Sequence, residues 1–446
     1  MITERGREEP EAGRPSDAGR PAPGRPALSL SALRLGDPWQ SPVTWPGYWL
    51  AGLLVVSAGY AVAVAIFSSD PVHRLWGDMA AIGYGVAALA VLAARGGLLL
   101  ESRLARWGID LALAASLLGA LLVPLSVMAV RHLRQPEVDV VARSAYTLIH
   151  HGTPYASATA LAATSDPNAY NPYLPVMALF GLPRALVASP VTDPRIWFGL
   201  AFLVVFAWAL RAGGARDTWR WTVLVAASPV VALELAVGGT DVPMVAFLCL
   251  GFALLASQPA PRVTLAAIAL GIAAGMKATA WPGLVVAIVM LAARDGWRAA
   301  ARFTGVAVAV AAVCIGPFLS PPRELVVNTI EFPLGLTRIR SAAASPLPGH
   351  LLAGLGHAGH TAVVGLLGLT ALAVAATLVI RPPRTVHRAV FLLVWAMSLM
   401  FLLAPSTRFG YFIYPGTLAL WLLAVTASRD GNDQHVVAPA CGPSHS

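Results

Sequence analysis

The chain has 446 residues, of which 57% are hydrophobic and only 12% charged, with a formal net charge of +9. Apolar runs of about 20 residues recur along its length, and each could cross a hydrocarbon core of about 30 Å, so this composition excludes a water-soluble globular protein. Its three cysteines, Cys249, Cys314 and Cys441, form neither a disulfide framework nor a spaced metal site. We therefore expect an all-α polytopic membrane protein with no metal, no cofactor and no nucleic-acid partner.

The amino-terminal segment, residues 1–44, is rich in Pro, Gly, Arg and Glu and has no hydrophobic periodicity, which predicts a disordered tail. It does not resemble a signal peptide, because the first apolar run begins too late. That run instead anchors the chain in the membrane. The segment after Ala427 is again polar. The expected organisation is therefore a membrane domain at residues 45–427 between two tails, residues 1–44 and 428–446.

About twelve apolar segments, most of them of roughly 15 to 23 residues, are candidate membrane spans. In chain order they are Tyr48–Phe67, Asp78–Ala94, Gly108–Val130, Ile196–Leu210, Trp221–Val237, Val242–Ala256, Val263–Met276, Trp281–Ala293, Phe303–Leu319, Thr361–Ile380, Arg388–Ala404 and Tyr411–Ala427.

If the amino terminus is cytoplasmic, the short connections on the inner side are consistently basic, as expected for cytoplasmic loops in a plasma-membrane protein. The connections concerned contain Arg95, Arg103 and Arg106; Arg211, Arg216 and Arg220; Arg262; Arg294, Arg298 and Arg302; and Arg381, Arg384 and Arg388. This pattern predicts that both termini are cytoplasmic. It also places the two long connections, residues 131–195 and 320–360, on the outer side.

The first long outer connection carries the residues best suited to chemistry. Residues 136–155 have an amphipathic helical pattern that ends at Gly152 and Pro154, with Glu137 and Asp139 in the first turn. The turn-rich, aromatic stretch 165–175 follows and leads into an apolar segment, residues 176–182, which is too short to span a membrane.

Lys277 is the only lysine in a chain whose other fixed cations are all arginines. It lies between two apolar half-spans, and Gly271, Gly275 and Pro282 around it favour a broken helix that turns at the outer side. An ionisable residue inside an apolar stretch indicates a functional site, here a cation for a phosphate group. The alternative is a lysine that reaches from the apolar region to the membrane surface.

Four of these features resemble glycosyltransferase family 87, whose members are GT-C-type membrane enzymes that include polyprenyl-phosphate-mannose-dependent α-mannosyltransferases. They are the acid after an early span, the helix that ends in Gly152-Thr-Pro-Tyr155, the turn Tyr170-Asn-Pro-Tyr-Leu-Pro175, and Gly275-Met-Lys-Ala-Thr-Ala-Trp-Pro282. The resemblance covers most of residues 130–427. It implies transfer of a hexose, mannose, from a polyprenyl-phosphate donor to a lipid or glycan acceptor at the outer face.

The resemblance places the family's catalytic aspartate at Asp139. Two departures from the family pattern are Arg143, where a tyrosine is common, and two additional spans at the amino-terminal end. The chemistry needs a base for the acceptor hydroxyl and cations for the developing phosphate charge, with inversion at the sugar carbon. We expect Asp139 as the base, with Glu137 as the alternative, and Lys277 and Arg408 as phosphate ligands.

Further candidates lie near the same outer side. The acid Asp241, together with Tyr170, Asn171 and Tyr173, is expected to bind the sugar or the acceptor, whereas the role of Glu234 stays open. The alternative for both acids is an ion pair with an arginine. The tyrosines could equally belong to an interfacial aromatic belt. In the second long connection, Arg340 is expected to bind phosphate and His350 to bind the acceptor, and the alternative for both is a solvated loop.

Two other functions are compatible with the sequence. A secondary transporter or lipid flippase would also have many spans and a broken helix near a charged residue. The long outer loop with its acids, and the lack of an evident internal repeat, favour an enzyme over alternating access. A GT-C-like scaffold without activity is the other alternative.

Overall fold

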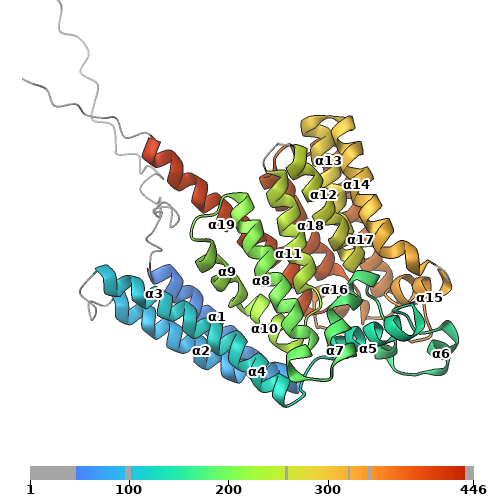
Figure 1. The fold of residues 1–446 in the computed structure, drawn as a ribbon, viewed down its shortest axis with the longest axis horizontal. Helices are drawn as coiled ribbons and strands as arrows, with labels where there is room; N and C mark the ends of the chain where they lie inside the picture. Colours follow the sequence, from blue (N-terminus) through green and yellow to red (C-terminus); the bar gives the residue numbers. More distant parts are fainter. Residues whose placement is uncertain are drawn as a thin grey trace, which may run out of the picture. The chain divides into compact units, whose positions relative to one another are not determined.

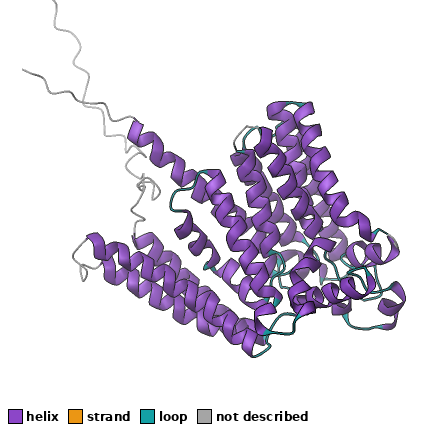
Figure 2. Ribbon diagram, viewed as in Figure 1, coloured by secondary structure: helices purple, strands orange, loops and turns teal. Residues whose placement is uncertain are grey.

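The computed structural model describes residues 47–95, 102–256, 260–319, 322–334, 336–339 and 343–436. These residues are helical almost throughout, and no strand is present among them (Figure 2). The prediction of an all-α polytopic membrane protein is therefore confirmed. The tail expected at residues 1–44 lies outside the described residues.

The amino-terminal helices form a group in which α2 packs between α1 and α3 (Figure 1). Their bounds are Gly47–Phe67 for α1, Pro71–Arg95 for α2, Ser102–Leu117 for α3 and Val123–Val130 for α4, with a π-helical turn, η2, at Leu118–Leu122 between α3 and α4. One indole and one phenol of α2 make buried hydrogen bonds. Trp76 Nε1 donates to Ala120 O at 2.7 Å, and Tyr84 Oη donates to Ala227 O at 2.5 Å. The second bond joins this group to the rest of the bundle.

Helix α11 is buried along almost its whole length, and α8, α10, α12, α18 and α19 pack against it. Their bounds and those of the other long helices are Pro194–Gly213 (α8), Thr218–Ala226 (α9), Pro229–Val237 (α10), Val242–Leu255 (α11), Ala260–Met276 (α12), Trp281–Asp295 (α13), Trp297–Ile315 (α14), His357–Ile380 (α17), Val386–Leu403 (α18) and Ile413–Val436 (α19).

All twelve predicted apolar segments are helical, but they differ in length and continuity. Nine helices in the described part of the chain are long and apolar enough to cross a membrane. Helices α11 and α12 are shorter, with 14 and 17 residues. The segment predicted as one span at Trp221–Val237 is instead divided between α9 and α10, which are bent by 65°. The bend follows from Pro229, because the residue before a proline is driven out of the helical conformation, and Ser228 is extended.

Short helices gather at one end of the long ones (Figure 1). They are α5 (Pro136–His151), α6 (Ala158–Ala163), η4 (Pro175–Gly181), α7 (Leu182–Leu186), α15 (Pro322–Val326) and α16 (Pro348–Ala353). The amphipathic helix predicted after residue 136 is confirmed as α5, and it ends at Gly152 in the left-handed conformation. The apolar segment at 176–182 forms η4 and the start of α7, which pack against α5.

The break predicted at Lys277 is also present. Helix α12 ends at Met276, Lys277 has an extended backbone, and the short turn η6 (Ala278–Ala280) leads into α13. The chain reverses direction there, so Lys277 lies at the same end as the short helices. The start of α1 and the described end of α19 lie at the other end (Figure 1).

Candidate functional site

Lys277 contacts side chains from two other segments of the chain. Its ammonium forms an ion pair with Asp241, donates a hydrogen bond to Thr240 Oγ1 at 3.2 Å, and lies 4.9 Å from the centre of the Tyr173 ring. Only 13% of the Lys277 side chain and 7% of the Asp241 side chain are exposed. The lysine is therefore a largely buried, paired cation rather than one that extends to the membrane surface.

Asp241 also receives a hydrogen bond from Tyr414, a residue that the sequence analysis did not single out. The Tyr414 hydroxyl donates to Asp241 Oδ1 and lies 2.8 Å from Thr279 Oγ1. Tyr414 belongs to the first turn of α19, and its side chain is completely buried. In the sequence it is an aromatic residue at the end of an apolar run, which is also typical of an interfacial belt. No local signal distinguishes the two roles.

A second ion pair joins the first turn of α5 to the connection between α18 and α19. Arg408 Nη1 donates to Glu137 Oε1, whereas Glu137 Oε2 is buried and has no hydrogen-bond partner among the described residues. Burial alone would lower the pKa of the Arg408 guanidinium, but the charge and hydrogen bond of Glu137, together with the nearby Tyr411 and Tyr173, outweigh this effect and raise the pKa. Arg408 is therefore a permanent cation that holds one carboxylate oxygen and leaves the other unpaired.

Tyr173 is close to both ion pairs. Its backbone carbonyl accepts from the Tyr155 hydroxyl at 3.0 Å, and the next residue, Leu174, donates to Met276 O at 2.9 Å. Burial raises the pKa of the Tyr173 phenol well above its usual value, and the negative charges of Glu137 and Asp241 raise it further. The phenol is therefore neutral, and both acids are near enough to act on it.

Glu234 is a third carboxyl in this region. It lies near the end of α10, is only 7% exposed, and interacts electrostatically with the acids and cations of both ion pairs. Gly410 makes room for it, because a Cβ at this position would overlap the Glu234 carboxylate. The site thus contains three carboxyls and two cations, and Glu234, whose role the sequence left open, belongs to it.

Arg195 fixes the position of α5. Its side chain is completely buried, donates to Leu133 O and Ala236 O, both at 2.9 Å, and pairs with Asp193 at 2.8 Å. Gly238, with a φ of 117°, allows close packing here, because a Cβ would overlap Val138 of α5. The first turn of α5 is therefore held against the end of α10. In the sequence, Arg195 is one of many arginines, and nothing near it indicates this role.

Asp139 lies on the exposed face of α5, away from the two ion pairs. Its carboxylate pairs with Arg134 at 2.7 Å, and 51% of the side chain is exposed. It makes no hydrogen bond or ion pair with the two cations of the site within the described residues. Of the two acids in the first turn of α5, the structure brings Glu137 to the site and turns Asp139 toward solvent.

The other predicted residues hold loops together. Asn171 is buried; its N–H donates to Asn328 Oδ1 at 2.8 Å and its side-chain oxygen accepts from Tyr173 N at 3.1 Å. The Tyr170 ring stacks on Phe332 with centres 4.3 Å apart. His350 Nδ1 lies 2.9 Å from Pro405 O, in the connection that carries Arg408. Arg340 lies outside the described residues.

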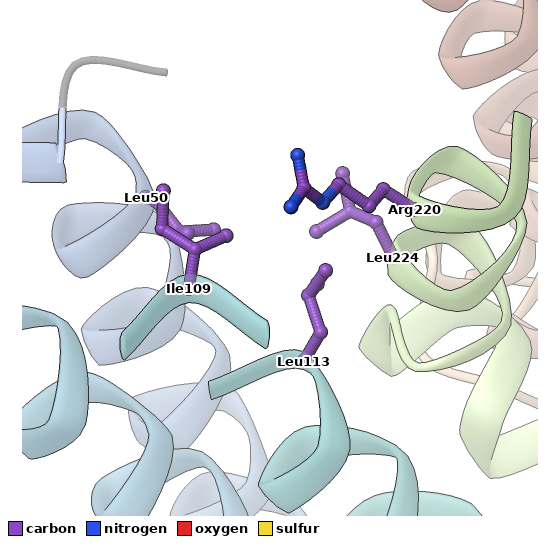
Figure 3. A pocket seen from close by; sticks show the side chains of 5 residues that line it. All are labelled: Leu50, Ile109, Leu113, Arg220 and Leu224. Carbon is purple, nitrogen blue, oxygen red and sulfur yellow. The ribbon is translucent and has the colours of Figure 1, made fainter. Parts of the chain in front are cut away.

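Nothing in the described parts of the bundle indicates a metal centre beside this cluster. No group of three His, Cys, Asp or Glu residues there could hold a metal ion. A hollow between α1, α3 and α9 is lined by four apolar residues and Arg220 (Figure 3) and has a volume of about 10 Å³. That volume suits at most one water molecule. Arg220 there pairs with Asp110 at 3.0 Å, so the hollow is a packing gap beside an ion pair.

The fold and the site together define a multi-pass membrane protein whose ionisable residues converge on a polar site at one end of its helices instead of facing lipid. Residues 171–405 match the pattern of glycosyltransferase family 87, which is more than half of the chain, and the protein belongs to this family. It is a membrane glycosyltransferase. The match contains Asp241 and Lys277. No curated protein matches the chain.

Proposed function

We propose that the protein transfers mannose from a polyprenyl-phosphate donor to a hydroxyl of a lipid or glycan acceptor, with inversion at the sugar carbon. The observation that carries the proposal is the state of Glu137. One of its oxygens is held by Arg408, and the other is buried without a partner among the described residues. A buried acceptor atom without a donor is costly, so an acceptor hydroxyl placed there would gain a strong hydrogen bond.

Lys277 is suited to bind the donor phosphate. An ammonium has three N–H donors, and Thr240 and Asp241 use two of them. The remaining donor can reach a phosphate oxygen, and the ring of Tyr173 covers the cation on one side. As the bond from the sugar to the phosphate breaks, negative charge grows on the phosphate, and fixed cations in a buried site stabilise that charge. Arg408 supplies a second positive charge close by.

The geometry supports Glu137 rather than Asp139 as the general base. In the proposed step the acceptor oxygen bonds to the sugar carbon, and its proton passes to Glu137. The bond from this carbon to the phosphate oxygen breaks, and polyprenyl phosphate leaves with the electron pair. A single displacement inverts the configuration, so a β-linked donor gives an α-linked product. Asp139 is paired and half exposed, which makes it a weaker candidate for this role.

The distribution of arginines supports an outer position for the site. The basic connections predicted to be cytoplasmic follow α2, α8, α11, α13 and α17, and these helices all run away from the end that contains Lys277. By the positive-inside rule the opposite end, with α5 and the Lys277 turn, faces outward. A lipid-linked donor suits that side, because soluble nucleotide sugars are made inside the cell.

Reconstitution in liposomes tests this proposal. Purified protein would be mixed with synthetic β-linked polyprenyl-phosphate mannose and an extract of envelope lipids, and new glycosidic bonds would be detected by mass spectrometry. We expect a mannosylated product from this donor and none from a nucleotide-linked mannose. Movement of the lipid donor across the bilayer without any new glycosidic bond would contradict the proposal and favour a flippase.

A further inference from the structure

We infer that the turn between α17 and α18 is a second binding site, for the phosphate group of an anionic membrane lipid. This turn lies at the end of the helices opposite to Lys277. It surrounds a cavity of about 510 Å³, whose polar wall consists of Thr377, Arg381, Arg384 and Arg388. The wall also contains Pro382 and Pro383, whose rings fix the backbone between the first two arginines.

The three arginines of this cavity have no acidic partner. None of their guanidinium groups forms an ion pair or a side-chain hydrogen bond within the described part of the chain. Residues 377–392 contain neither Asp nor Glu. By contrast, Arg294 at the same end of the bundle pairs with Asp295 at 2.8 Å. Three guanidinium groups around one cavity repel one another, and an anion between them removes that repulsion.

The position of the cavity favours a lipid over a soluble ligand. Helix α17 ends at Ile380, so the arginines lie where a membrane-spanning helix meets the surface. Only 6% of the α17 span is buried by the rest of the protein, so this helix faces lipid along its length. The cavity wall is completed by apolar Ile380 and Leu392, which can contact acyl chains below a bound headgroup. Basic pockets at this depth recognise anionic headgroups.

Orientation of the chain in the membrane is another role for these arginines. That role needs only positive charge on one side and does not require that the charges line a shared cavity. The two roles can be separated in purified protein, where orientation no longer matters. Arg211, Arg298 and Arg302 provide a matched control, because they carry the same total charge at the same end but do not line this cavity.

Native mass spectrometry of the full-length protein, released from detergent, tests the inference. Wild type, Arg381→Gln/Arg384→Gln/Arg388→Gln and Arg211→Gln/Arg298→Gln/Arg302→Gln would be titrated with phosphatidylglycerol, phosphatidylcholine or inorganic phosphate. We expect one phosphatidylglycerol to bind the wild type and the control equally, and to bind the cavity variant about 10- to 100-fold more weakly. Phosphatidylcholine should not show this difference.

The inorganic phosphate arm identifies the source of the phosphate group. Displacement of phosphatidylglycerol by millimolar phosphate, with the same loss in the cavity variant, would mean that the phosphate alone is recognised. Binding of the lipid only would mean that the acyl chains also contribute, as the apolar wall indicates. Equal binding by the wild type and the cavity variant, or equal loss in both triple variants, would overturn the inference. Neither triple variant alters the active site, so failure here would leave the proposed reaction unaffected.

Discussion

Lys277 and Asp241 depend on each other, since each neutralises a charge that would otherwise be buried alone. Removal of one partner of such a pair costs about 3–5 kcal/mol, whereas removal of both is often neutral. A single substitution at Lys277 therefore mixes two effects, the loss of a substrate contact and the burial of Asp241 without its cation. The double variant separates them.

We expect Lys277→Met to abolish donor binding and Lys277→Arg to impair it, because a planar guanidinium does not fit where a compact ammonium contacts both Asp241 and the Tyr173 ring. The double variant Lys277→Met/Asp241→Asn should regain thermal stability but not transfer activity. Binding of a fluorescent polyprenyl phosphate, together with the melting temperature in detergent, would measure the two effects. Recovery of activity in the double variant would show that Lys277 only balances the charge of Asp241.

Some residues of the site could be predicted from the sequence and others could not. Lys277 is identifiable because it is the only lysine and interrupts an apolar run. The sequence does not distinguish Glu137 from Asp139 as the residue that faces the site, since both lie in the first turn of one helix. The distinction depends on which side of α5 faces α10, and this orientation is set by Arg195 and Gly238 far along the chain. Tyr414 was missed for the same reason, because its partner Asp241 is distant in sequence.

At the scale of the elements, the sequence predicts helices well and their breaks less well. Twelve apolar segments were expected to be helical, and all of them are. The break at Lys277 was expected from Gly275 and Pro282, whereas the 65° bend before Pro229 was not, although the same rule about residues before proline applies to Ser228. Helix α11 has 14 residues, fewer than a full membrane span needs. This length is possible because other helices surround it and separate it from lipid.

The buried ion pair between Asp193 and Arg195 should make the free energy of unfolding depend on pH. Burial alone would raise the pKa of the Asp193 carboxyl, but the hydrogen bonds and charge of Arg195 outweigh this effect and lower the pKa below its ordinary value. The folded protein thus prefers ionised Asp193. This contribution to stability is complete above the unfolded pKa of about 3.9 and is lost as the pH falls through the lower folded value.

We expect Asp193→Asn to destabilise the protein by about 3–5 kcal/mol at neutral pH, because it leaves the Arg195 charge buried without its acid. The loss relative to wild type should shrink at acidic pH, below the unfolded pKa. Asp139→Asn is the matched control, since it breaks a half-exposed pair that contributes about 0–1 kcal/mol. Melting temperatures of both variants in detergent, measured from pH 7 to pH 3, would check this. Equal effects of the two substitutions on the melting temperature would contradict a stabilising role of the ion pair between Asp193 and Arg195.

In the molecule as a whole, different polar features lie at the two ends of the long helices. The short helices and the turn between α12 and α13 lie at one end, and the basic connections lie at the other (Figure 1). This separation was predicted from the positions of arginines alone, because each short connection has a definite side once the number of spans is known. The contacts that close the site could not be predicted in this way, since several of them join residues that are more than 100 positions apart, such as Glu137 with Arg408 and Asp241 with Tyr414.

Cysteine labelling tests the orientation. In a variant without the three native cysteines, Ser165→Cys should react with a membrane-impermeant maleimide in intact cells, because the α6–η3 connection is exposed at the end that bears the site. Arg298→Cys, exposed at the opposite end, should react only after the membrane is permeabilised. The reverse pattern would place the site inside the cell, where nucleotide sugars are available, and would remove the main support for a lipid-linked donor.

The central claim is that Glu137 takes the proton of the acceptor hydroxyl while a sugar leaves a lipid phosphate. The most direct test compares single-turnover transfer by Glu137→Gln and Asp139→Asn in liposomes, at matched protein amounts and with saturating polyprenyl-phosphate mannose. We expect Glu137→Gln to reduce the transfer rate on the order of 10²- to 10⁴-fold, as is typical for removal of a general base, and Asp139→Asn to reduce it less than about tenfold. The wild-type product should be α-linked. A steep loss in Asp139→Asn with little change in Glu137→Gln, or no loss in either variant, would contradict the account.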